Sequence, residues 1–251
     1  MWNSSAHSGR RRWLVPSLLL AIPLGGAKAQ GLPLPSRWSL EVRCGDLVNM
    51  TGDSGVFLRR DGAPGNLTTL VKHQRVSSLR GGLEAIQGLE ISLDVSSGGL
   101  ESAVEDLVGS PGIMPFATGK LRLARLGIWF NEGLFDSCQP PLFAPGNPRR
   151  WRWSVGMVAG RLQASGVSLM DEGSRFAGIE SVSPGAETMV GIGARAEIKL
   201  GSSGWFVGVE STMGWAGGYL LAVRTRSDSP YHGTQIKHGP AQFLLGVGYH
   251  F

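Results

Sequence analysis

The chain has 251 residues, a formal net charge of +5 and only two cysteines, Cys44 and Cys138. Four basic residues lie within residues 1–29, where there is no acid, so residues 30–251 are left with a net charge near +1. This removes the basic excess typical of nucleic-acid-binding proteins and argues against a nucleic-acid partner. Neither cysteine has the spacing of a metal-ligand set, although an oxidising compartment would allow a disulfide between them.

The first 29 residues have the pattern of a cleaved secretory signal peptide. Three arginines at positions 10–12 precede an apolar stretch at 13–23, and Ala27 and Ala29 fit cleavage before Gln30. The apolar stretch is shorter than the ~18–20 residues that a membrane-spanning helix needs, which disfavours an anchor. We therefore expect a signal peptide at residues 1–29 and a single exported domain at residues 30–251.

Eight stretches of the exported domain alternate apolar residues with polar or small ones, which is the period of a β-strand. Residues 89–97 alternate most strictly and follow a two-residue turn at Gln87 and Gly88. The alternation changes phase near Arg125, which predicts a β-bulge there. The predicted strands are residues 38–49, 76–86, 89–97, 118–131, 150–165, 186–200, 205–224 and 242–251.

The connections between these strands alternate between long and short. The polar connections at 50–75, 98–116, 166–185 and 225–238 are long, whereas those after the second and sixth strands are tight turns. Even-stranded barrels of the bacterial outer membrane have this alternation of long outer loops with short periplasmic turns. The Pro-rich connection 132–149 is longer than this pattern predicts.

Two of the long connections contain local patterns of their own. Residues 68–72 read as a strand extension within the first connection. Within the second, apolar residues at helical spacing predict a short amphipathic helix. These residues are Leu100, Val104, Leu107 and Val108.

The last ten residues have the features of an assembly signal. Phe243, Leu245, Val247, Tyr249 and Phe251 share one strand face, opposite a face of small and polar residues. The aromatic residue 251 resembles the closing residue that the barrel-assembly machinery of outer membranes recognises. Aromatic residues near predicted strand ends would form a girdle at the level of the lipid head groups. These are Trp38, Trp129, Trp151, Trp153, Trp205, Tyr249 and Phe251.

Residues 38–43, 89–95, 126–131 and 151–160 together resemble the OmpW group of outer-membrane proteins. The resemblance implies an all-β chain that forms a single eight-stranded antiparallel transmembrane β-barrel. It further implies a location in the cell outer membrane of a Gram-negative-type bacterium, contact with outer-membrane lipids, and no cofactor. An OmpW-like barrel would act as a narrow, porin-like passage for small hydrophobic ligands. Related eight-stranded families share this pattern, and the long connection 132–149 leaves the subfamily open.

Charged residues on the polar strand faces are expected to point into the barrel. An eight-stranded barrel has an interior that side chains fill, and unpaired charges there are costly. Acids and bases in near balance therefore predict a structural network of ion pairs in preference to a polar conduit. The predicted lumen charges are Glu41, Arg43, Arg80, Glu84, Glu90, Asp94, Arg152, Arg195, Glu197, Lys199 and Glu210.

Apolar residues inside the polar connections would line a hydrophobic mouth, and Ile113, Met114 and Phe116 are the main candidates. The same residues would serve equally well as loop packing. A structural or adhesive surface barrel is the alternative function, because the same strands with other loops would serve it.

A lipid-modifying outer-membrane enzyme is a further alternative. His232 and His238 lie close in sequence to Ser227, Asp228 and Ser229, and a nucleophile needs a base and an orienting carboxylate. Residues of these types are common in polar loops, and no His-x-Ser spacing occurs on a predicted strand. We therefore expect no catalytic, metal or cofactor site.

Overall fold

The computed structural model describes residues 37–49, 55–63, 67–106, 112–134 and 150–251. The predicted signal peptide, Cys138, Leu107 and Val108 lie outside these ranges. Cys44 lies on the exposed face of the first strand.

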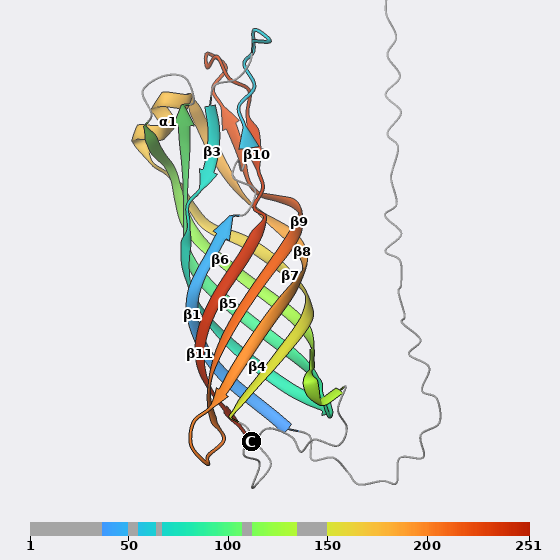
Figure 1. The fold of residues 1–251 in the computed structure, drawn as a ribbon. Helices are drawn as coiled ribbons and strands as arrows, with labels where there is room; N and C mark the ends of the chain where they lie inside the picture. Colours follow the sequence, from blue (N-terminus) through green and yellow to red (C-terminus); the bar gives the residue numbers. More distant parts are fainter. Residues whose placement is uncertain (1–36, 50–54, 64–66, 107–111, 135–149) are drawn as a thin grey trace, which may run out of the picture. The chain divides into compact units, whose positions relative to one another are not determined.

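Eight antiparallel strands form a closed ring (Figure 1). The ring closes where the first strand pairs with the last, from Ser39 opposite His250 to Asn49 opposite Pro240. Closure leaves no free edge along the ring, so every wall strand has a partner on both sides. In ring order the strands are β1 (Arg37–Asn49), β4 (Gln74–Ile86), β5 (Leu89–Asp106), β6 (Ile113–Asn131), β7 (Trp151–Leu169), β8 (Ile179–Lys199), β9 (Trp205–Thr225) and β11 (Pro240–His250).

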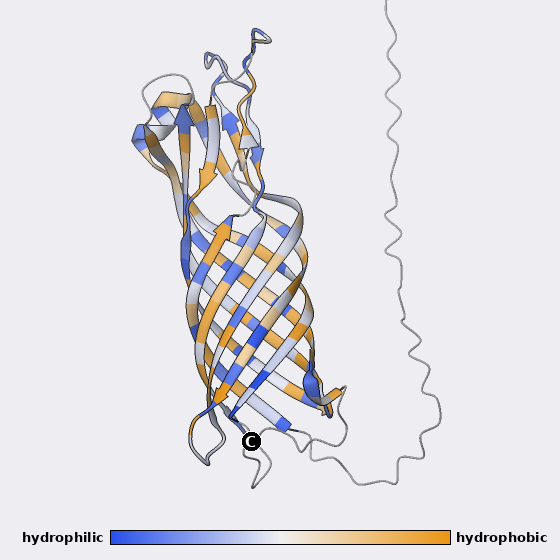
Figure 2. Cartoon of the chain, in the orientation of Figure 1, coloured by the Kyte–Doolittle hydropathy of each residue, from blue (hydrophilic) through white to orange (hydrophobic). Residues whose placement is uncertain are grey.

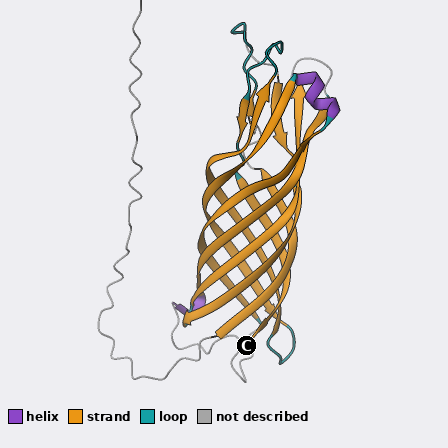
Figure 3. Cartoon of the chain, turned by 180° about the vertical axis from the view of Figure 1, so that it is seen from behind, coloured by secondary structure: helices purple, strands orange, loops and turns teal. Residues whose placement is uncertain are grey.

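The ring confirms the eight predicted strands and extends several of them beyond one end of the barrel. We call this the loop end, and the opposite end, where β1 begins and β11 ends, the terminal end. The loop end also carries β2 (Gly55–Val56), β3 (Leu67–Val71), β10 (Thr234–Ile236) and the helix α1 (Asp171–Ala177), as Figure 3 shows from behind. A short 3-10 turn, Glu132–Leu134, follows β6 at the terminal end.

Two local predictions are wrong. The expected helix after residue 98 is strand as far as Asp106, because Leu100 and Val104 pair with β6 and Val104 also pairs with β3. Pairing on both sides satisfies the backbone and overrides the local helical spacing. The expected bulge at Arg125 is also absent from β6, where Arg125 pairs in register with Asp94 and Gly160. Register shifts occur instead between Thr118 and Lys120 in the pairing of β6 with β7, and at Phe116 in its pairing with β5.

Hydrophobic and hydrophilic residues alternate along the barrel strands (Figure 2), and the outward-facing residues form an apolar band. On β8 the band runs from Val190 to Ile198, and the next outward residue toward the loop end is Thr188. No other described element covers these side chains, so their exposed surface is the one that lipid contacts in a transmembrane barrel. Members of the band include Leu40, Val42, Leu79, Leu93, Val95, Leu126, Ile128, Val155, Met157, Ile192, Val209, Met213, Leu245 and Val247.

Aromatic residues gather at the terminal end of the band. Trp38, Trp151 and Trp205 are half or more exposed, and Trp205 makes an edge contact with Tyr249 at 5.3 Å between ring centroids. Trp129 is not part of this girdle, contrary to prediction. It is 2% exposed inside the barrel and donates a 2.9 Å hydrogen bond from Nε1 to the Ser92 hydroxyl. Gly156 leaves it room, since a Cβ there would lie 2.7 Å from its ring.

The interior has two parts. Charged side chains fill it within the apolar band, and a packed apolar core fills it at the loop end. No helix in the described ranges is long and apolar enough to cross a membrane.

Candidate functional site

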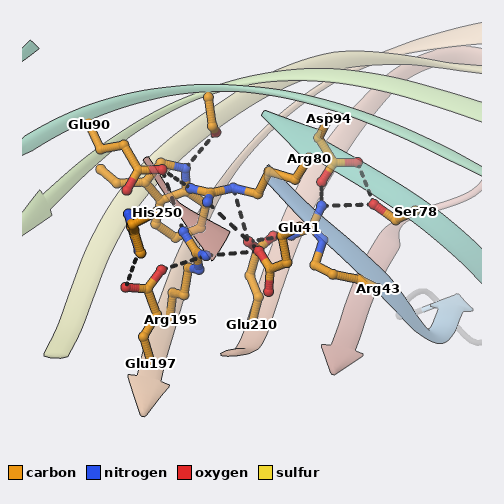
Figure 4. Close-up of polar contacts among 12 residues, drawn as sticks. Glu41, Arg43, Ser78, Arg80, Glu90, Asp94, Arg195, Glu197, Glu210 and His250 are labelled. Carbon is orange, nitrogen blue, oxygen red and sulfur yellow. Dashed lines mark hydrogen bonds and ion pairs between the residues drawn. The ribbon is translucent and has the colours of Figure 1, made fainter. Parts of the chain in front are cut away.

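Ten charged side chains fill the lumen within the apolar band, and we call them the lumen network. Figure 4 labels all of them except Arg125 and Arg152. Alternation along seven different strands turns them inward, and none is more than 5% exposed. Five are arginines and five are acids, so their formal charges cancel. The lumen network comprises Glu41, Arg43, Arg80, Glu90, Asp94, Arg125, Arg152, Arg195, Glu197 and Glu210.

The half of the network nearer the terminal end is centred on Glu197. Arg152 donates from Nε to Glu197 at 2.7 Å, and Arg195 lies 2.5 Å from the same carboxylate. The ring of His250 lies 3.7 Å from Glu197 as well. Arg80 continues the network through a 2.7 Å ion pair with Glu90. Each acid therefore contacts more than one cation, which is what a buried carboxylate needs to stay ionised.

The half nearer the loop end is centred on Glu210. Arg43 and Arg125 each lie 2.7 Å from this carboxylate, and Arg125 also pairs with Asp94 at 2.7 Å. Arg80 connects the two halves, since its Nε lies 3.9 Å from Glu210. Multiple bonds of this kind brace opposite walls of the barrel and leave the lumen filled by side chains.

Two predicted lumen charges lie at the margin of the network, and one member was not predicted. Glu84 is half-buried and 3.7 Å from Arg152, while Lys199 is half-buried at the end of β8. Arg125 was missed because the alternation of β6 was assigned out of phase. Uninterrupted alternation back from Ile128 and Leu126, which face outward, was the sequence signal that could have turned Arg125 inward.

The predicted mouth residues do not share one environment. Phe116 is fully buried in the apolar core with Phe57 and Leu100, and Met114 packs against that core. Ile113 is 53% exposed at the loop end. Of the three, only Ile113 presents a largely accessible apolar side chain at the opening.

The wall of the barrel divides between β7 and β8. Their pairing ends at Gln163 opposite Ala186. Beyond this point β7 follows β6 as far as Leu169, and β8 begins at Ile179 alongside β9. We call residues 164–169 and 179–185 the β7–β8 fork. Val167 and Val182 lie on its two arms, each partly buried against the apolar core.

The groups considered for catalysis are not assembled. The Ser229 hydroxyl donates to the Ala177 carbonyl, and the backbone N–H of His232 donates to the Leu58 carbonyl. His238 donates its backbone N–H to Glu187 at 2.8 Å. Within the described ranges, no hydrogen bond joins Ser227 or Ser229 to either of these histidines.

Glu187 and His238 form a buried polar pair on the loop-end side of the apolar band. Burial raises the pKa of the Glu187 carboxyl to about 7, against the lowering effect of the His238 N–H and of Lys237. Burial lowers the pKa of the His238 imidazole to about 4. Glu187 is fully buried, so its carboxylate is not an exposed catalytic base. The expected effect of the pair is on the stability of the folded barrel.

Comparison with known proteins rests on structure alone, because no family model and no curated protein matches the sequence. Outer membrane protein OprG from Pseudomonas aeruginosa is similar over 85% of this chain and 95% of that chain, with a TM-score of 0.64 and 13% identity. The chain has the fold of the eight-stranded outer-membrane β-barrels. The predicted fold class and the OmpW-like resemblance are therefore confirmed at the level of the fold.

Two further outer-membrane structures match this barrel more loosely. Outer membrane protein AlkL is similar over 86% of this chain and 90% of that chain, with a TM-score of 0.49 and 14% identity. The N-terminal barrel domain of Pseudomonas aeruginosa OprF covers 85% of this chain and 97% of its own, with a TM-score of 0.41 and 13% identity.

Proposed function

We propose that this barrel resides in the outer membrane after export by a cleaved signal peptide and admits small hydrophobic molecules. In this proposal they enter at the loop end and leave sideways through the β7–β8 fork into the membrane. The observation that carries the proposal is the division of the wall between β7 and β8, directly outside the apolar band. A solute that leaves there reaches the head-group region of the membrane without passing the lumen network.

The lumen network supports a sideways route over an axial one. Its members are nearly inaccessible to solvent and brace the barrel from wall to wall. An axial route would require several buried ion pairs to separate, and each broken pair would leave uncompensated charge in the interior.

The interior at the loop end suits apolar molecules. Leu162, Met189 and Leu220 are buried there, and Val167 and Val182 extend the apolar surface to the fork. A hydrophobic molecule that enters there gains transfer free energy by leaving water, and it must displace packed side chains to do so. Exposed Ile113 would supply the first contact at the opening.

The test measures entry of a hydrophobic fluorescent probe into vesicles that contain the purified barrel. Val167→Asp with Val182→Asp places charge on both arms of the fork and should reduce entry toward that of protein-free vesicles. Val56→Asp with Leu58→Asp adds the same charge on exposed residues of the first connection and should leave entry unchanged. Faster migration of unheated protein on a detergent gel verifies folding for each variant.

Unchanged entry in a folded fork variant would refute the sideways route. Wild-type entry no faster than that of empty vesicles would refute the passage itself. It would favour the structural or adhesive alternative. An open polar cleft of about 770 Å³ at the loop end supports that alternative, because Arg60, Arg224 and Arg226 line it with Glu180 and Asp228.

A further inference from the structure

We propose that the outward face of β6 and β7 binds a phosphorylated lipid of the surrounding membrane, with its head group on a basic patch and an acyl chain in a neighbouring groove. The basic patch consists of Lys120, Arg122 and Arg161, all exposed. The proposal depends on the transmembrane fold and is independent of any passage through the barrel.

The basic patch lies where the apolar band ends. On β6 the outward residues pass from Ile128 and Leu126 to Arg122 and Lys120. On β7 they pass from Met157 to Arg161 in the same direction. Lipid head groups begin where the apolar band of a barrel ends, so these cations are placed at head-group level.

The register between β6 and β7 brings the cations together. Arg122 lies opposite Gln163, and Arg161 lies opposite Ala124. The two arginines are therefore diagonal neighbours on one face, a relationship that places side chains within about 7–8 Å. Guanidinium groups bind phosphate oxygens through paired hydrogen bonds, and two adjacent guanidinium groups can share one phosphate.

In the part of the chain that the structure describes, no acid neutralises this patch. The residues opposite it on the flanking strands are Ser97 and Gly99 of β5 and Thr188 of β8. The nearest outward acid, Glu101, is diagonal to Lys120, and its carboxylate is bonded to Lys72. Among the described residues, no ion pair involves any of the three patch cations.

Three cations at the loop end differ in this respect. Arg59 pairs with Asp61 at 2.6 Å, Arg224 with Glu180 at 3.3 Å, and Arg226 with Asp228 at 3.5 Å. Acids thus neutralise these three loop-end cations, whereas the patch cations have no such partner among the described residues. An external anion is the complement that the patch lacks.

An apolar groove lies on the same outward face, farther from the loop end. It has a volume of about 540 Å³, and small residues form part of its wall, since Ala194 lies opposite Ser211. Met157 is four residues from Arg161 along β7, or about 13 Å at ~3.3 Å per residue. The groove is lined by Phe130, Val155, Gly156, Met157, Ile192, Gly193, Ala194, Ser211 and Met213.

The patch and the groove together match the phosphate head group and the acyl chain of a single amphiphilic lipid. A phosphate on Arg122 and Arg161 leaves an attached acyl chain to run along the outward face of β7 toward Met157. An acyl chain gains from the groove because it buries more apolar surface there than on a flat wall. A lipid without phosphate would gain binding free energy from the groove alone. Inorganic phosphate would gain it from the patch alone.

Native mass spectrometry of the full chain in non-ionic detergent tests the proposal, with diphosphorylated lipid A as the probe. Lys120→Gln, Arg122→Gln and Arg161→Gln combined should weaken retention of the lipid by about tenfold, because the charge-assisted bonds to phosphate are lost. Arg59→Gln, Arg224→Gln and Arg226→Gln combined remove the same charge at the loop end and should leave retention unchanged. All six residues are at least partly exposed, so both variants are expected to fold.

Three comparisons complete the test. Dephosphorylated lipid A should be retained about as weakly as lipid A is by the patch variant. Ala194→Phe should weaken retention of both lipids by filling the groove, and millimolar inorganic phosphate should not displace lipid A. Equal retention of lipid A by the wild type and the patch variant would overturn the proposal. If the loop-end control lost as much lipid A retention as the patch variant, general charge attraction would explain both results. That outcome would also overturn the proposal.

Discussion

Arg195 on β8 donates a 2.8 Å hydrogen bond to Glu41 on β1, although β9 and β11 separate these strands in the ring. The bond therefore crosses the lumen. Arg195 also contacts Glu197 on its own strand and Glu90 on β5, at 2.5 and 3.5 Å. One guanidinium thus connects three strands, and its fixed fork of donors suits this role better than a lysine would.

Reversal of this charge should destabilise the barrel. Arg195→Glu would place a fourth carboxylate beside Glu41, Glu90 and Glu197, all of them buried. We expect a loss of about 3–5 kcal/mol in the free energy of unfolding, the typical cost of breaking a buried pair. Urea unfolding in lipid vesicles measures it. Arg224→Glu, on an exposed side chain, should cost less than about 1 kcal/mol, and equal losses would contradict a bracing role for Arg195.

The position of an outward-facing charge along β8 should determine how much it lowers the free energy of unfolding. Ile192→Arg places a cation within the apolar band and should cost about 2–4 kcal/mol. Thr188→Arg faces the same way but lies outside the band, and it should cost no more than about 1 kcal/mol. The same unfolding experiment compares the two. A larger cost at Thr188 would show that the band is placed wrongly along the strand.

The strands could be predicted because a side-chain period of two is a local property of the sequence. Residues 89–97 and 186–200 alternate strictly, and both are strands in the ring. The helix expected after residue 98 failed for a non-local reason. Its apolar spacing is compatible with a helix, and only pairing with β3 and β6 makes it a strand. No single-segment pattern contains that information.

The site was predictable only in part, for a related reason. Alternation indicates which charges turn inward, but the pairing of Arg195 with Glu41 depends on which strands face each other across the ring. The predicted strands end at 165 and resume at 186, close to where the β7–β8 pairing ends, but the continuation of the fork's two arms along β6 and β9 depends on non-local pairing. The basic patch depends on register, since Arg122 and Arg161 are far apart in the chain.

Phe251 should act in assembly more than in stability. Its side chain is 72% exposed, and its described ring contact is an edge contact with Tyr249 at 5.1 Å. Phe251→Ser should therefore change the free energy of unfolding by less than about 1 kcal/mol. In cells it should still reduce the amount of folded barrel several-fold, as pulse-chase with a gel-shift assay would show. Normal folded amounts in cells would contradict the assembly role.

Glu187 and His238 should give opposing pH dependences. The pKa of Glu187 is raised to about 7, so its contribution to stability is present at low pH and is lost as pH rises through about 7. The pKa of His238 is lowered to about 4, so its contribution is present above its ordinary pKa and is lost as pH falls toward about 4. Between these limits the two effects offset each other, which predicts a shallow profile for the wild type.

Glu187→Gln should reveal the pH dependence that His238 alone gives to the free energy of unfolding. The variant keeps an oxygen acceptor for the His238 N–H but cannot ionise, so its stability should fall continuously from about pH 6.5 to 4. His238→Gln should show the reverse, with stability falling as pH rises from about 5 to 7, by up to about 3 kcal/mol. Differences between each variant and the wild type cancel the contributions of other carboxylates. Parallel profiles for all three proteins would show that neither group titrates differently in the folded barrel.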